Sequence, residues 1–468
     1  MLGYAREAGH EITPDAQDAD VLVVNTCAFI DRAKQESIDA ILEMAQQKRD
    51  GKCSRLVVTG CLAERYREEL RTEIPEIDAL LGTGELPGIV DAIGSRSEAG
   101  GARSVSGQPV TFFRKNRAGT PPGDPGTSIL EPPAAPRASH LAPPALPTYL
   151  YGADTPRVLT TPRHFAYVKI AEGCDYTCAF CIIPTLRGKY RSRTRESIVA
   201  EARALGERGV KELLLISQDT TFYGIDRQER GGLAKLLREL NDIDGIEWIR
   251  LLYLYPTTIT DDVLAAMAEC EKVCRYVDLP LQHASADVLK RMRRPGNRKT
   301  YDALLARIRE RVPGVTLRTT FIVGFPGETE AEFAELEGFV RDTGFDHIGV
   351  FTYSHEEGTR AYAVTDDVAA ATKRKRRDRI MKLQQGIVAA RQEARIGAEV
   401  PVLIDGPSAE HELVLQGRLE GQAPDIDPVV YLTDCDPSEY SAGQLITVRV
   451  VGARGYDLMV APVGPSKG

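Results

Sequence analysis

The stretch FAYVKIAEGCDYTCAFC, residues 165–181, joins an apolar strand pattern directly to three cysteines. Cys174, Cys178 and Cys181 follow the strand at once, separated by three residues and then by two. A zinc site prefers four ligands, and this loop offers no further cysteine or histidine. Three thiolates suit a cubane iron–sulfur cluster that keeps one iron open for a substrate or cofactor. The alternative is that the cysteines are buried or incidental.

The same strand opens a series of six strand and helix patterns over residues 162–396. Helical segments with short turns separate the strands. Such repeats predict an open or partial α/β barrel, with its chemistry at the carboxyl ends of the strands. The predicted strands are FAYVKIAEG, KELLLISQD, WIRLLYLYP, YVDLPLQHA, TLRTTFIVGF and HIGVFTYS.

The sequence pattern of residues 1–93 predicts a separate α/β domain with a parallel sheet. The segments DADVLVVNTCAFI and CSRLVVTGCLAE contain short, bounded β-branched runs typical of buried strands, and KQESIDAILEMAQQKR between them has helical apolar spacing. The chain opens with an amphipathic helix, MLGYAREAGHEI, that no strand precedes. We therefore expect the first strand of this sheet to be missing and one sheet edge to be exposed.

Two further cysteines, Cys27 and Cys61, each follow one of these N-terminal strands. Parallel sheets bind ligands beyond the carboxyl ends of their strands, so both thiols are expected to face a common crevice. Ordinary buried packing is the alternative. The remaining cysteines have no such placement, and we interpret them as structural: Cys53, Cys270, Cys274 and Cys435.

The rest of the chain divides into a linker and a small C-terminal domain. Residues 94–161 are rich in Pro, Gly, Ser and Ala, which favours a flexible linker. Residues 397–464 show short alternating runs between turns, as in a small β-barrel. From residue 399 to the end, eleven acidic residues stand against four basic ones, a difference of −7 in a chain whose net charge is −8. Such a module would repel nucleic-acid phosphates and attract a basic partner.

Composition excludes several classes of protein. No apolar run reaches the ~18 residues of a membrane span, and the start has no secretory signal pattern. The nine cysteines are an odd number in a chain of 468 residues, which argues against a disulfide framework. We expect reduced thiols, a cytoplasmic location and no membrane association.

The cysteine spacing, with Phe180 just before the last cysteine, resembles the radical S-adenosylmethionine superfamily. The resemblance implies that the open iron chelates S-adenosylmethionine, whose reductive cleavage gives a 5′-deoxyadenosyl radical. Gln218 and Asp219, at the end of the second strand, become candidates to hold the methionine amino group of the cofactor or a second ligand; ordinary polar strand-end residues are the alternative. Gly324, Gly327 and Glu328, in IVGFPGETE, become candidates to pack against the cofactor; a plain Pro-Gly turn is equally compatible.

Two basic stretches lie in the same region. In RGKYRSRTR, cations recur at every second position from Arg187 to Arg195. An extended chain would present them on one face, either as a clamp for carboxylate or phosphate or as a solvated edge. The run from Lys373 to Arg377 predicts a solvated helix face rather than an RNA contact.

End to end, the chain resembles the methylthiotransferases. The resemblance rests on VVNTCAFIDRAKQESID, LVVTGCLAERY, CDYTCAFCIIPTLRGKYRSR, YLYPTTITDDV, VDLPLQHASADVLKRMRRPG and TTFIVGFPGETEAEF. It implies an N-terminal domain for an auxiliary cluster, a radical S-adenosylmethionine barrel and a C-terminal TRAM β-barrel. The implied cofactors are two 4Fe-4S clusters, one on Cys174, Cys178 and Cys181 and one on Cys27 and Cys61, together with S-adenosylmethionine. The family's first auxiliary cysteine is absent, so that cluster is expected to be incomplete.

The family has two branches, and YLYPTTIT, LPLQHAS and GRLEGQAPDIDPVVYL resemble the one that methylthiolates the β-carbon of an aspartate in ribosomal protein S-12. That branch implies S-12 or the small ribosomal subunit as partner, a reductant such as flavodoxin or ferredoxin, and a monomer. The sequence does not identify the sulfur donor. The alternatives are the branch that modifies a tRNA adenosine, and an inactive ribosome-binding protein.

Overall fold

The computed structural model describes residues 1–94, 110–113, 146–408, 411 and 413–463. These residues form two compact units. The first comprises residues 1–28 and 32–149, and the second comprises residues 29–31 and 150–468. No described helix combines the length and the apolar character that crossing a membrane requires.

The first unit is built on a parallel sheet with the strand order β3-β2-β1-β4. The two central strands are almost wholly buried, as their β-branched sequences predict. The parallel sheet expected for this region is confirmed. Its elements are α1 (Leu2–Glu7), β1 (Val21–Thr26), α2 (Asp31–Asp50), β2 (Arg55–Gly60), α3 (Cys61–Arg65), α4 (Arg67–Glu73), β3 (Ile77–Leu81), η1 (Leu86–Gly88), α5 (Ile89–Gly94) and β4 (Val110–Phe113).

The strand β4 corrects two predictions. It pairs in parallel with β1, in the register Val21 with Val110, and covers the edge that was expected to be exposed. It also lies inside the range predicted to be a linker. Most of that range, residues 95–109 and 114–145, lies outside the described residues. Its last part, from residue 150, belongs to the second unit, where the Tyr151 hydroxyl accepts from Lys169 N at 2.8 Å and Arg157 Nη2 donates to Tyr167 O at 2.6 Å.

The second unit contains the predicted partial barrel. Its six parallel strands form two three-stranded sheets, β5-β8-β9 and β10-β11-β12. A single bridge between Ile249 and Val273 continues the pairing from one sheet to the other. All six strands lie where the sequence predicts them: β5 (Phe165–Lys169), β8 (Glu212–Ile216), β9 (Trp248–Leu251), β10 (Tyr276–Asp278), β11 (Thr316–Val323) and β12 (His347–Thr352).

Helices on the outer face complete each repeat and bury one continuous apolar core against the strands. Several begin at side-chain caps: Thr194 caps α7, and Asn297 and Thr329 form capping boxes at α11 and α12. The elements between the strands are β6 (Ala171–Glu172), α6 (Ile183–Arg187), β7 (Arg191–Ser192), α7 (Arg195–Glu207), η2 (Thr220–Phe222), η3 (Ile225–Arg227), α8 (Gly232–Asn241), α9 (Asp261–Glu269), α10 (Ala286–Arg291), α11 (Arg298–Arg311) and α12 (Glu330–Thr343).

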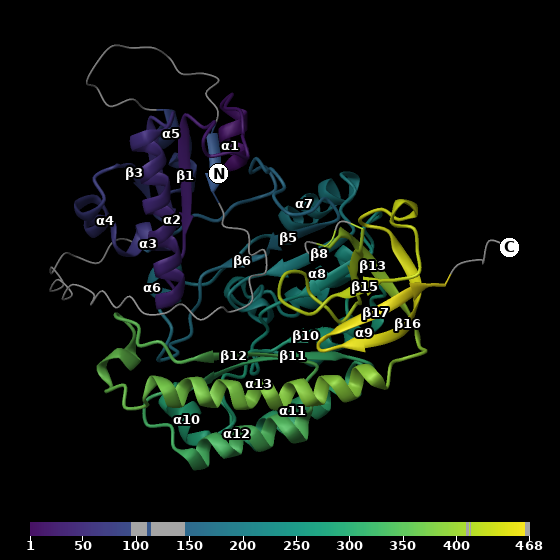
Figure 1. Ribbon diagram of the computed structural model, residues 1–468. Helices are drawn as coiled ribbons and strands as arrows, with labels where there is room; N and C mark the ends of the chain where they lie inside the picture. The colour runs from purple at the N-terminus through teal and green to yellow at the C-terminus, as the bar shows by residue number, and fades with distance from the viewer. Residues whose placement is uncertain (95–109, 114–145, 409–410, 412, 464–468) are drawn as a thin grey trace, which may run out of the picture. The chain divides into compact units, whose positions relative to one another are not determined.

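The basic helix α13 (Ala370–Glu393) follows η4 (Arg360–Ala363) and lies along β11 and β12, with α12 beside it (Figure 1). Its basic run is only partly a solvated face, which corrects the prediction. Lys373 is buried, contacts Asp366 at 2.6 Å and donates to Tyr353 O at 3.3 Å, just beyond β12. Arg376 is buried and contacts Glu328 at 3.1 Å. Two cations of the run therefore attach the helix to the core.

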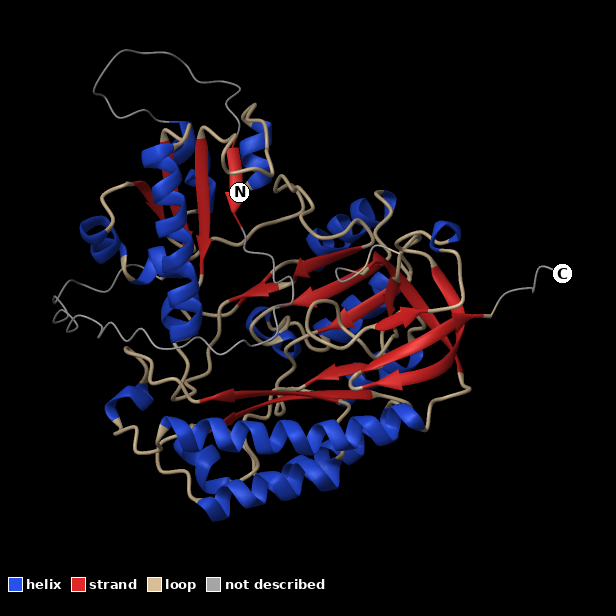
Figure 2. Cartoon of the chain, in the orientation of Figure 1, coloured by secondary structure: helices blue, strands red, loops and turns tan. Residues whose placement is uncertain are grey.

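The C-terminal residues form the predicted small β-barrel, closed in the order β13-β14-β15-β17-β16 around its own apolar core (Figure 2). The barrel contains β13 (Glu399–Pro407), β14 (Leu415–Arg418), β15 (Val430–Leu432), η5 (Pro437–Glu439), β16 (Leu445–Arg454) and β17 (Asp457–Pro462).

Buried charges join this barrel to the starting ends of the core strands. Glu212, the first residue of β8, contacts Arg418 at 2.6 Å and Arg250 at 2.7 Å. Arg418 also contacts Asp405 at 2.8 Å, and Asp405 lies 2.8 Å from His164. A second set, at the start of β10 and in β11, joins Tyr276 and Arg318 to Asp427. Some of the C-terminal acidity therefore serves to attach the domain.

Candidate functional site

The three-cysteine loop begins beyond the carboxyl end of the first barrel strand, at the edge of the core where the sequence predicts the chemistry. Backbone hydrogen bonds fix it at several points. Cys174 N donates to Gly188 O at 3.1 Å, Ala179 N donates to Met292 O at 2.8 Å, and Cys181 N donates to Cys178 O at 3.1 Å. The loop is thus held in a defined conformation by the protein itself.

The three thiols are free and partly buried. Burial, with a smaller contribution from the charge of Cys178, raises the pKa of Cys174 to about 11 and that of Cys181 to about 12. Thiolates at these positions therefore require a positive centre that compensates their charge, as iron does. Among the described residues, no group of three or more His, Cys, Asp or Glu side chains lies close enough together to hold a single metal ion. A cubane binds each thiolate through a different iron, so the loop's donor set fits a cluster.

Gln218 and Asp219, predicted to bind the cofactor, brace the cysteine loop at the end of β8. Gln218 Oε1 accepts from Gly173 N at 2.7 Å. Asp219 is buried, and burial raises its pKa. Its carboxylate accepts from the Thr221 and Phe222 amides, from the Thr221 and Thr258 hydroxyls, and from the Tyr176 hydroxyl at 2.9 Å. These contacts favour a positioning role for Asp219 over direct cofactor contact.

Glu328 likewise organises its own turn. It accepts from Gly324 N at 2.6 Å and from Phe325 N at 3.2 Å. Burial raises its pKa to about 7, although the nearby Arg376 guanidinium lowers it. Gly324 has φ +74, and a Cβ there would lie 2.3 Å from Lys373 Cγ, so this glycine packs against α13. Phe180 packs on a small apolar cluster with Ala179 and Phe325.

Three residues near the cysteines were not predicted. Tyr176, inside the loop, stacks on Tyr255 with ring centroids 3.9 Å apart. The guanidinium of Arg294 lies over the Tyr255 ring at 4.3 Å, and its Nη1 lies 3.8 Å from Cys178 Sγ. Tyr255 follows β9 by four residues, so its strand-end position was a signal that could have been used.

Three cations of RGKYRSRTR have partners within the protein, so neither of the two alternatives, a clamp for anions or a solvated edge, describes the whole stretch. Arg193 is buried against Glu201 at 2.6 Å. Arg187 contacts Glu172 at 3.3 Å, and Arg191 donates to Lys189 O at 2.5 Å. This stretch stabilises the loop internally.

Cys27 and Cys61 lie beyond the ends of neighbouring strands in the first unit, as predicted. Thr26 and Gly60, which precede them, are register partners in β1 and β2. Cys27 is exposed, whereas Cys61 is buried at the start of α3. Cys53 precedes β2, at the opposite end of that strand, which argues against Cys53 as a third ligand beside them.

Replacing Gly173 by alanine is expected to displace the cysteine loop. Gly173 has φ +89, and a Cβ there would lie 2.1 Å from Lys189 O. Gly209 is a matched control, because it has φ +88 and nothing within 4 Å of a Cβ. Gly209→Ala should cost about 1–2 kcal/mol and keep iron binding. Gly173→Ala should cost more and lose most of the iron bound by the loop. Denaturant unfolding and iron assays test this; equal iron in both variants would contradict it.

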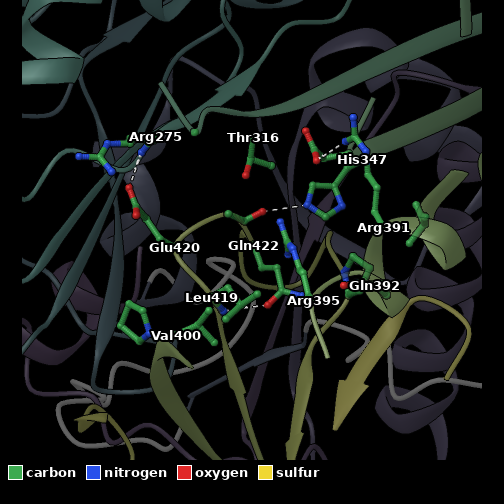
Figure 3. Close-up of a pocket in the computed structure, with 16 residues that line it drawn as sticks. Arg275, Thr316, His347, Arg391, Gln392, Arg395, Val400, Leu419, Glu420 and Gln422 are labelled. Atoms are coloured by element: carbon green, nitrogen blue, oxygen red, sulfur yellow. Dashed lines mark hydrogen bonds and ion pairs between the residues drawn. The ribbon is translucent and has the colours of Figure 1, made fainter. Parts of the chain in front are cut away.

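A separate cavity of about 250 Å³ lies at the opposite ends of the strands, between the core and the C-terminal barrel (Figure 3). Thr316 and His347, which begin β11 and β12, line it together with Arg395 and Gln422. His347 Nε2 lies 2.8 Å from Gly421 O. None of the predicted site residues lines this cavity.

Three family models match the chain in order. They are the uncharacterized protein family UPF0004 over residues 1–82, the radical SAM superfamily over residues 168–340 and the TRAM domain over residues 396–463. A solved structure, the radical S-adenosylmethionine methyltransferase TsrM from Kitasatospora setae, aligns with 71% of this chain and 72% of that chain, at 17% identity and a TM-score of 0.42.

Curated relatives match along nearly the whole chain. The ribosomal protein uS12 methylthiotransferase RimO of Solibacter usitatus is 46% identical over 471 residues, covering 100% of this chain and 92% of the relative. The protein of the same name from Koribacter versatilis is 45% identical, covering 98% and 92%.

The six-strand core, the cysteine loop beyond its first strand and the C-terminal barrel define the class: the chain is a radical S-adenosylmethionine enzyme with a TRAM domain. The sequence identity to the curated relatives extends well beyond residues 168–340, the part matched by the radical SAM model. The chain belongs to the RimO family of ribosomal protein uS12 methylthiotransferases, as the resemblance predicted.

Proposed function

We propose that this enzyme transfers a methylthio group to the β-carbon of an aspartate in ribosomal protein uS12. The observation that carries the proposal is the identity to relatives of that name, maintained from the N-terminal sheet to the C-terminal barrel. The three thiols beyond the first core strand fit the radical chemistry that such a transfer requires.

Within the core, Cys174, Cys178 and Cys181 would hold a 4Fe-4S cluster with one open iron. When bound, this cluster supplies the electron for the reductive cleavage of S-adenosylmethionine. Gln218 would present its amide nitrogen to the cofactor, because its oxygen is already used by Gly173 N. Asp219 acts on the loop through Tyr176.

The turn after β11 would shape one wall of the cofactor site. Glu328 fixes that turn through the Gly324 and Phe325 amides, and Phe180 approaches it from the cysteine loop through their shared apolar cluster. These residues would therefore act by packing and shape.

Cys27 and Cys61 would hold the auxiliary cluster in the first unit, where S-adenosylmethionine would also donate the methyl group. Their strands end in register, so the two thiols extend the same edge of the sheet.

The partner would be the basic protein uS12, alone or in the small ribosomal subunit. The enzyme would act as a monomer in the cytoplasm, with a flavodoxin or ferredoxin as reductant. The C-terminal barrel also has acidic side chains on its surface, Asp434 among them, which would favour contact with a basic protein. Attraction of this kind weakens with salt, because the Debye length is only ~10 Å at 0.1 M.

The substrate is tested with uS12, intact small subunits and tRNA, each incubated with reconstituted enzyme, S-adenosylmethionine, reductant and sulfide. We expect methylthiolation of the protein, detected by mass spectrometry, and binding that weakens as salt rises. Methylthiolated tRNA with unmodified uS12 would reject the proposed substrate.

The double variant Cys27→Ala/Cys61→Ala is the control within this experiment. It should still form 5′-deoxyadenosine, because the core loop is intact, but it should transfer no methylthio group. Transfer at the unmodified enzyme's rate would remove these two cysteines from the mechanism.

A further inference from the structure

Five arginines are buried among the described residues, and one of them differs from the rest. Arg193, Arg250, Arg376 and Arg418 each contact a carboxylate within 3.1 Å. Arg294, 9% exposed, forms no ion pair with a carboxylate in the described residues. A buried charge needs a counter-charge, so the neighbours of Arg294 indicate what its counter-charge is.

The neighbour in question is a cluster thiol. Arg294 Nη1 lies 3.8 Å from Cys178 Sγ, within hydrogen-bond range for sulfur. Nη2 donates to Pro280 O at 2.5 Å, which fixes the direction of the guanidinium plane. Cys178 as a thiolate, alone or bound to iron, supplies negative charge at this position.

The surrounding contacts hold the guanidinium and the loop together. Arg294 lies over Tyr255, which stacks on Tyr176 between Cys174 and Cys178. Two residues before Arg294, Met292 O accepts from Ala179 N at 2.8 Å, next to Cys178. The segment 292–294 therefore contacts the cysteine loop through the backbone, through an aromatic stack and through the sulfur.

We propose that Arg294 is a positioning residue that sets the reduction potential of the cluster on the three-cysteine loop, an inference that rests on the cluster assignment in the proposed function. Its guanidinium keeps a permanent positive charge beside one ligand sulfur. Reduction makes the cluster more negative, so a neighbouring cation stabilises the reduced form more than the oxidised form. Arg294 thus makes the cluster easier to reduce and holds Cys178 in place.

The experiment uses the full chain carrying Cys27→Ala/Cys61→Ala, so that only the core loop offers a proposed cluster site. Arg294→Met, Arg294→Lys and Arg291→Met are compared in this background. Arg291→Met is the matched control, because Arg291 lies three residues away in the sequence and pairs with Glu332 at 2.9 Å. Each protein is reconstituted anaerobically and titrated reductively with EPR detection.

In Arg294→Met the ratio of reduced to oxidised cluster at a fixed potential should fall about tenfold. This corresponds to a midpoint potential lower by about 59 mV for a one-electron couple. Arg294→Lys should shift less, because it keeps the charge but cannot bond to Pro280 O and the sulfur as a fork does. Arg291→Met should not shift. Loss of iron from Arg294→Met, with an unchanged circular dichroism spectrum, would also support the positioning role.

Equal midpoint potentials in Arg294→Met, Arg291→Met and the background protein would overturn the role of Arg294 and leave the proposed function standing. No cluster in the background protein would overturn both. The iron assay on that protein separates the two results.

Discussion

Cys178→Ala is expected to reduce 5′-deoxyadenosine formation to the level of a reaction without protein. Two remaining thiolates, from Cys174 and Cys181, leave a second iron of the cubane without a protein ligand, so the cluster should not survive isolation. The fold should persist, because the loop's backbone hydrogen bonds do not use the thiols. Iron content, product analysis and circular dichroism after anaerobic reconstitution measure the three effects.

Cys435→Ala is the matched control for this substitution. Cys435 is a free, partly buried thiol in the C-terminal barrel, so its removal should leave iron content and product formation unchanged. Product at the unmodified enzyme's level from Cys178→Ala would reject the cluster assignment.

Arg418→Met is expected to lower the free energy of unfolding by about 3–5 kcal/mol, the usual effect of breaking a buried ion pair from one side. The substitution leaves the buried Glu212 and the largely buried Asp405 with only Arg250 and His164 to compensate their charges among the described residues. Denaturant unfolding followed by circular dichroism gives the difference.

Arg449→Met tests whether this loss comes from burial. Arg449 lies in the same barrel and contacts Glu399 at 2.8 Å, but both side chains are about half exposed. Its loss should cost no more than ~1 kcal/mol. Equal losses in the two variants would show that the buried network does not hold the C-terminal barrel.

The strands of the core were predictable because each is a short apolar run bounded by turns and followed by a helix pattern. The cysteine loop was predictable for the same reason, since all three ligands lie within eight consecutive residues. The strand β4 was not, because its four residues stand inside a range whose composition favours a linker and are paired only through β1.

Contacts between distant residues explain the other differences. Cys178 and Arg294 are 116 positions apart, and no local pattern marks the arginine as a neighbour of the cluster. Lys373 and Arg376 look like a solvated basic run, but Asp366 and Glu328 neutralise them in the fold. Asp219 lies at a strand end, where a cofactor-binding residue is expected, but its carboxylate accepts hydrogen bonds from Tyr176 and Thr258. Those two contacts, which indicate a positioning role, cannot be read from the local sequence.

The attachment of the C-terminal barrel also sets a length requirement for the substrate. That barrel is fixed where the core strands begin, whereas the cysteines lie beyond the end of the first strand, at the edge where all six finish. The longest of the six core strands, β11, has eight residues, so the two ends are about 26 Å apart. Because buried ion pairs fix the barrel to the core, the distance between the two ends is constant. A peptide of fewer than about eight extended residues can occupy the reacting edge alone, whereas a longer chain or a folded protein can contact both ends.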